Sequence, residues 1–115
     1  MENENLIMSL IVDAGNARSH AMEAIRLAKE GDVEEAEVSL RKADAEMTKA
    51  HNAQTGLIQN EVKGAHTEIS LFMVHAQDHI MTAILAKDLA REFVELYKKI
   101  NGSVSLRPPC RNPLS

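Results

Sequence analysis

Apolar residues recur every three or four positions through most of this chain. The first stretch places them largely on small residues: Ile7, Leu10, Ala14, Ala17, Ala21, Ala24 and Ala28. The second repeats the spacing with one polar member, Gln54: Val33, Ala36, Leu40, Ala43, Met47, Ala50, Gln54 and Leu57. This spacing gathers each set on one face of an amphipathic helix, and small residues let helix axes approach closely.

The breaks between stretches indicate where the helices end. Gly31 suits the position after a helix, and Asp32 suits an N-cap because Glu35 follows three residues later. Gly64 ends the second stretch, and Thr67 is the expected N-cap of a third helix running from about Glu68 to about Ile100. Short turns force neighbouring helices to be antiparallel. The predicted fold is all-α, an up-down-up antiparallel three-helix bundle.

The third stretch carries two stripes rather than one. The first is apolar and comprises Ile69, Met73, Ala76, Ile80 and Ala83. The second repeats every 3.5 residues and has three consecutive polar members: Leu71, His75, Asp78, Thr82, Leu85 and Leu89. Since a single bundle buries one stripe of each helix, the other predicts a partner chain and therefore a homo-oligomer built on this helix.

The polar members suggest a site, because His75, Asp78 and His79 lie at i, i+3 and i+4. Imidazole and carboxylate could bind a metal, although Ala76 replaces the glutamate of zinc-protease helices. His75 could instead carry a phosphoryl group, with donors supplied by the neighbouring Gln77, His79 and Thr82. Gln77 is expected to face a neighbouring helix. A third interpretation is that hydrogen-bonded core residues fix the register of the helices.

Composition narrows the function classes. Hydrophobic residues make up 44% and aromatics 3%, which favours closely packed helices over a sheet. Residues 1–100 carry 11 basic and 17 acidic residues, so nucleic acid is not an expected partner. The N-terminal region has no basic segment, and Asp13 ends the apolar run at residues 6–12, so neither a signal peptide nor membrane insertion is predicted. The single cysteine, Cys110, fits a reducing compartment, and we expect a cytoplasmic protein.

The chain divides into one domain, residues 1–101, and a tail, residues 102–115. The tail has no periodicity and contains Pro108, Pro109 and Pro113. We expect the tail to be disordered. Its different composition is typical of a segment added by cloning or by a reading-frame error.

The block Val74-His75-Ala76-Gln77-Asp78-His79-Ile80-Met81-Thr82 resembles the IIA component of the bacterial phosphotransferase system, lactose/cellobiose (chitobiose) class. The resemblance covers about residues 5–100 and includes Asn52-Ala53-Gln54-Thr55. It implies a phosphocarrier that accepts a phosphoryl group from phosphorylated HPr on Nε2 of His75. The carrier would pass the group to a cysteine of the cognate IIB component during uptake of a lactose/cellobiose-type disaccharide.

The resemblance also implies a homotrimer of three-helix bundles in which three copies of Asp78 share one divalent cation, Mg²⁺. Phe72, Met73 and Met81 would give HPr its apolar contacts near His75. One alternative is a two-component histidine phosphotransfer domain, but such domains usually carry Lys and Gly where Asp78 and His79 stand. Another is a non-enzymatic, metal-stabilised trimeric helical bundle.

Overall fold

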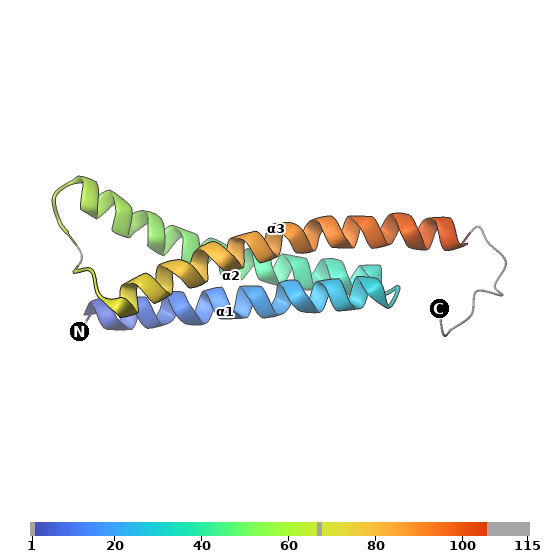
Figure 1. The fold of residues 1–115 in the computed structure, drawn as a ribbon, viewed down its shortest axis with the longest axis horizontal. Coiled ribbons are helices and arrows are strands. Elements are labelled where there is room, and N and C mark those ends of the chain that lie inside the picture. The colour runs from blue at the N-terminus through green and yellow to red at the C-terminus, as the bar shows by residue number, and fades with distance from the viewer. Residues whose placement is uncertain (1, 67, 106–115) are drawn as a thin grey trace.

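The computed structural model describes residues 2–66 and 68–105, and it is helical. The chain forms α1 (Glu2–Lys29), α2 (Val33–Val62) and α3 (Leu71–Ser105), with no strand among the described residues. Helices α1 and α3 run in the same direction and α2 runs in the opposite direction, which gives a rod of 64 × 22 × 17 Å (Figure 1). The predicted up-down-up bundle is therefore confirmed for the single chain.

The turn between α1 and α2 forms as the sequence predicts. Gly31 has a φ of +93°, which a residue without Cβ adopts at little cost. Its N–H donates to the carbonyl of Ala28 at 3.0 Å, and that of Asp32 donates to Leu27 at 2.9 Å. The Asp32 carboxylate then accepts from the N–H of Glu35 at 3.3 Å, so one residue pair ends α1 and begins α2.

The start of α3 differs from the prediction. The helix begins at Leu71, and Ser70 is its N-cap, because its hydroxyl accepts from the N–H of Met73 at 3.1 Å. Thr67, the predicted cap, lies outside the described residues, and residues 68–70 are not helical. The end of α2 lies apart from the start of α3, so the connection between the two helices spans this separation (Figure 1).

The other end of α3 also differs, because the helix continues to Ser105. The helix therefore runs beyond its expected end at about Ile100 and includes residues 102–105, while residues 106–115 lie outside the described part. Gly102 lowers helix propensity but does not end a helix, and the first proline comes only at Pro108. The amide of Asn101 donates to the carbonyl of Ala28 at 3.4 Å, which ties this end of α3 to the end of α1.

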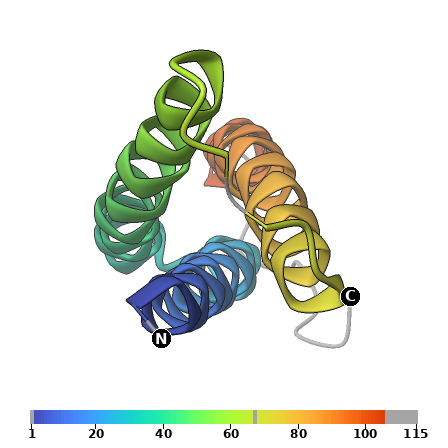
Figure 2. The same ribbon diagram turned by 90° about the vertical axis from the view of Figure 1, so that its left-hand side faces the viewer.

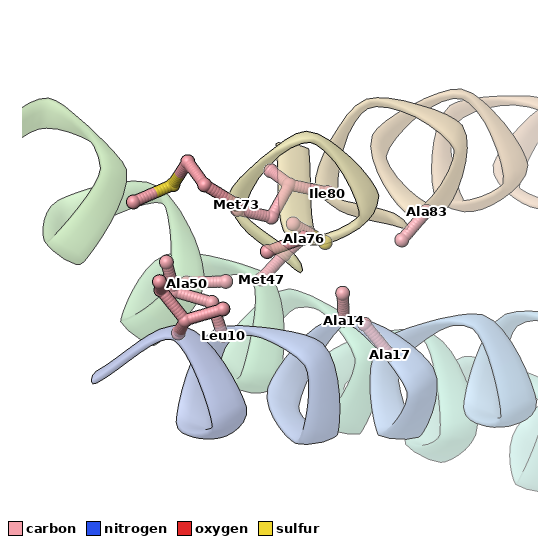
Figure 3. Packing of buried hydrophobic residues seen from close by; sticks show 10 residues of the cluster. Leu10, Ala14, Ala17, Met47, Ala50, Met73, Ala76, Ile80 and Ala83 are labelled. Atoms are coloured by element: carbon pink, nitrogen blue, oxygen red, sulfur yellow. The ribbon is translucent and has the colours of Figure 1, made fainter. Parts of the chain in front are cut away.

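Alanines make up much of the core. Every predicted member of the α1 stripe is buried, and its five alanines have no exposed surface. Figure 3 shows Leu10, Ala14 and Ala17 facing the buried side of α3, around Ala76, Ile80 and Ala83. A second apolar cluster, centred on Leu40 and Val94, fills the other half of the rod. Between Ala83 and Ala90, the buried stripe of α3 has a polar member, Lys87. Its ammonium lies 3.3 Å from the carboxylate of Asp44 on α2.

Helix α1 packs against both other helices far more extensively than α2 packs against α3. The C-terminal half of α2 accordingly diverges from its neighbours (Figures 1 and 2). A cleft of about 150 Å³ opens there, lined by Leu57, Ile58, Glu61, Ile69, Met73 and Gln77. None of the described helices combines the length and apolar character needed to cross a membrane.

Candidate functional site

The structure places the two stripes of α3 on opposite sides of the helix. Met73, Ala76, Ile80 and Ala83 are buried in the core. The mixed stripe faces outward, with His75, Asp78 and Thr82 exposed beside Leu71, Leu85 and Leu89, which are 85%, 59% and 48% exposed. Ile69 departs from the prediction, because it precedes the helix and is 83% exposed. The outward stripe is therefore free, within one chain, to meet another molecule.

His75 and His79 form a pair one helical turn apart. Their rings are T-shaped, with centres 4.8 Å apart and planes 84° apart. His75 is exposed and His79 is half-buried. The exposed ring of His75 can be reached by a partner, and His79 is close enough to contact a group bound to it.

Gln77 points toward α2, as predicted. The amide nitrogen of Gln54 on α2 donates to Oε1 of Gln77 at 2.6 Å. That bond leaves the nitrogen of Gln77 to donate to the thioether of Met73, at 3.8 Å. Since residues two apart on a helix do not face each other, Gln77 is directed away from His75. Its contact with α2 fixes the segment that carries His75.

The Thr82 hydroxyl is engaged with the backbone. It donates to the carbonyl of Asp78 at 2.9 Å and also lies 3.2 Å from that of His79. Thr82 could therefore serve a phosphoryl group, as the sequence suggests, only after giving up this local bond. Asp78 is exposed and has no ion pair with any described residue.

Within the described residues, no three His, Cys, Asp or Glu side chains come together to hold a metal ion. Asp78 is the carboxylate that lies next to the histidine pair in sequence and on the same stripe. Sequence reasoning missed Gln54 as a partner of the site, although its position as the polar member of an apolar stripe was the signal. It is 8% exposed, and a buried amide of that kind requires a partner.

Residues 5–98 match the family described as PTS system, lactose/cellobiose specific IIA subunit. The chain belongs to this family. It is 56% identical over 99 residues to the lichenan-specific phosphotransferase enzyme IIA component of Bacillus subtilis (strain 168), with 86% of this chain and 90% of the relative covered. It is 39% identical over 101 residues to the N,N'-diacetylchitobiose-specific EIIA component of Escherichia coli (strain K12), covering 88% and 87%.

Solved structures agree with this assignment. The cellobiose-specific enzyme IIA of Bacillus anthracis superposes with a TM-score of 0.85 at 48% identity, covering 89% of this chain and 94% of that one. The IIA(chitobiose) of Escherichia coli, determined in complex with HPr, gives 0.74 at 38% identity, covering 85% and 95%. This IIA chain is therefore a phosphotransferase component of a sugar-transport system. The matched residues include the whole segment from His75 to Thr82.

Proposed function

We propose that this IIA protein is a cytoplasmic phosphocarrier that is phosphorylated by HPr on Nε2 of His75 and passes the group to a cysteine of its cognate IIB. The exposed ring of His75, on the outward stripe of the family-matched segment, is the observation that carries the proposal. The related Escherichia coli structure is a complex of IIA with HPr, which supports the choice of donor.

The proposed chemistry needs only one ring nitrogen. A neutral imidazole has one in-plane lone pair, which attacks the phosphorus carried by the donor histidine. An N–P bond to His75 forms while the donor's N–P bond breaks, and the donor imidazole leaves with the electron pair. In the second step a thiolate of IIB attacks, an S–P bond forms and His75 leaves. His79, whose ring centre is 4.8 Å from that of His75, is placed to donate to a phosphoryl oxygen.

The outward stripe supports self-association. Beyond the polar segment it is apolar, with Phe93, Leu96 and Ile100 42%, 50% and 43% exposed. A row of large apolar side chains on one helix face is typical of a surface buried against a partner. We assign it to a homotrimer in which the α3 helices surround the symmetry axis, as the family resemblance implies.

The same arrangement would gather three copies of Asp78. Carboxylate oxygens suit a hard ion such as Mg²⁺, and no three potential ligands come together within the described residues of one chain, so we place the ion where copies of Asp78 would meet. Its contribution would be positive charge that offsets the three carboxylates. No step of phosphoryl transfer requires it.

The apolar surface available to HPr is smaller than the sequence predicts. Met81 is 56% exposed and Phe72 is half-buried, so both can contact a donor. Met73 is only 7% exposed and belongs to the core, so its predicted role in docking is wrong. The relatives are specific for lichenan, chitobiose and lactose, and we therefore propose only a sugar of the lactose/cellobiose type.

Phosphorylation by purified enzyme I, HPr and phosphoenolpyruvate, followed by mass spectrometry, tests the proposal. One phosphoryl group should be added to the wild type and none to His75→Ala. His79→Ala should be phosphorylated more slowly, and His51→Ala, on the surface of α2, at the wild-type rate. Circular dichroism should show unchanged helicity in all variants. Full phosphorylation of a folded His75→Ala would overturn the assignment.

A further inference from the structure

The two site histidines match a metal-binding pattern as well as a phosphorylation site. Imidazoles at i and i+4 on one helix face can bind one ion together. His75 and His79 have this spacing and lie next to each other. We propose that they form a two-ligand site for Zn²⁺ and that zinc bound there blocks phosphorylation of His75. The inhibitory part rests on the proposed function, whereas the metal site does not.

The separation of the rings agrees with shared coordination. A Zn–N bond of about 2.0–2.1 Å puts the ion about 3.2 Å from each ring centre, and a tetrahedral angle then separates the two centres by about 5 Å. The observed separation is 4.8 Å. The planes stand 84° apart, so binding requires the rings to turn from the T-shaped arrangement until a nitrogen lone pair of each points at the ion, and the exposed ring of His75 is free to do so.

The ligands select the type of ion. Imidazole suits Zn²⁺ and Cu²⁺, whereas Mg²⁺ prefers oxygen ligands and would bind carboxylates such as Asp78 instead. No third His, Cys, Asp or Glu joins a metal-binding group within the described residues. The remaining coordination positions are therefore left to water, and binding is reversible and weaker than at a structural zinc site.

Coordination and phosphorylation compete for the same electrons. A neutral imidazole has one lone pair in the ring plane, and its other nitrogen carries a proton. When His75 donates that pair to zinc, it has none with which to attack phosphorus. The competition is reciprocal, because an Nε2 that carries a phosphoryl group no longer has a lone pair with which to bind the ion.

Titration of the metal-free full chain with zinc chloride, followed by calorimetry, tests the site. His75→Gln and His79→Gln should each lower the affinity of this site at least about tenfold, since loss of a ligand costs no less than loss of its supporting contacts. His20→Gln and His51→Gln, on α1 and α2, are matched controls and should bind as the wild type does. Wild-type zinc affinity in either site variant would overturn the proposal.

The inhibitory effect is tested with phosphorylated HPr prepared beforehand. Zinc at a saturating concentration should slow phosphorylation of the wild type at least tenfold, whereas His79→Gln should keep its own zinc-free rate. Equal slowing of both proteins, or no slowing of a zinc-loaded wild type, would refute inhibition through this pair. If the wild type is not phosphorylated even without zinc, the proposed function fails, and the titration still decides whether the metal site exists.

Discussion

The amide pair Gln54–Gln77 joins α2 to α3 beside the site, and its two members differ in burial. Gln54 is 8% exposed, whereas Gln77 is half-buried. Gln77→Leu should therefore lower the free energy of unfolding by about 1–3 kcal/mol, because it leaves the buried Gln54 amide without its oxygen partner. Gln54→Leu should cost less, since the Gln77 amide can reach water. Urea denaturation of each variant measures the difference.

The double variant is the control for this pair. Replacing both amides with leucine removes the unsatisfied group, so its stability should lie close to that of the wild type. If the loss of stability in the double variant equals the sum of the losses in the two single variants, the Gln54–Gln77 hydrogen bond is not the cause of either loss. Phosphoryl-transfer rates of the same proteins show whether the pair also positions the segment that carries His75.

Glu46 gives the bundle a pH-dependent contact between α1 and α2. Hydrogen bonds from Lys49, at 2.7 Å, and then from Asn16, at 3.1 Å, hold the pKa of Glu46 below its ordinary value. The stability that they contribute is fully present above the ordinary value of 4.5 and is lost as the pH falls through the lowered pKa. Glu46→Gln should thus be less stable than the wild type at pH 7.

The difference between the two proteins should disappear on acidification. Thermal unfolding at pH 7 and at about pH 3 measures it, with Asn16→Ala and Lys49→Met identifying the partner responsible. The effect should be smaller than that of Gln77→Leu, because Lys49 is exposed and solvent weakens its ion pair. A gap that persists unchanged at pH 3 would show that charge is not its source.

At the scale of helices, periodicity predicted the buried faces well and the boundaries unevenly. Gly31 and Asp32 combine two strong signals in adjacent residues, and that boundary was predicted correctly. Ser70 was missed because Met73 stands where an acidic residue would strengthen the cap signal. The C-terminal part of α3 was missed because residues 102–105 carry no helical periodicity and the prolines of the tail were taken to exclude a helix, although the first of them comes only at Pro108.

The contacts of polar residues on buried stripes were the hardest feature to predict from the sequence. Lys87 occupies a core-facing step of α3, yet its side chain is 21% exposed and reaches Asp44, which also pairs with Arg91 at 2.8 Å. Long side chains can place a charge outside a core that their stems help to cover. Sequence spacing alone cannot show that such a partner is within reach, because the partner lies on another helix.

Gly56 offers a test at the same scale, because it lies within α2 without needing to be glycine. It has no positive φ, and an added Cβ would meet nothing within 4 Å. Gly56→Ala should therefore raise the free energy of unfolding by about 0.5–1 kcal/mol. Gly64→Ala is the matched control: space is equally free there, but the φ of +92° disfavours a Cβ, and stability should fall by about 1 kcal/mol. Destabilisation by Gly56→Ala in urea denaturation at fixed protein concentration would contradict this account.

At the scale of the whole molecule, the outward stripe was found from the sequence because polar residues interrupt an apolar repeat. The exposure of His75, Asp78 and Thr82 agrees with that interpretation. The local bond of the Thr82 hydroxyl and the orientation of Gln77 depend on rotamers and on a second helix, which a repeat does not specify. The stripe, its apolar continuation and the site form one surface, so assembly and chemistry should be coupled.

That coupling can be tested at Asp78. Three carboxylates about 4 Å apart would repel by about 4 kcal/mol per pair at an effective dielectric constant near 20. A trimer that gathers them must relieve this repulsion, by a shared cation or by protonation of part of the cluster. If a cation does so, as we propose, EDTA at neutral pH should shift the wild type toward monomer in sedimentation equilibrium. Asp78→Asn should assemble equally with and without EDTA, because its repulsion is gone. His79→Gln should remain sensitive to EDTA, which separates this ion from zinc at the histidine pair. A wild-type trimer equally stable with and without EDTA, at neutral and at alkaline pH, would rule out the shared ion and leave protonation or carboxylates that turn away from the axis as the explanation.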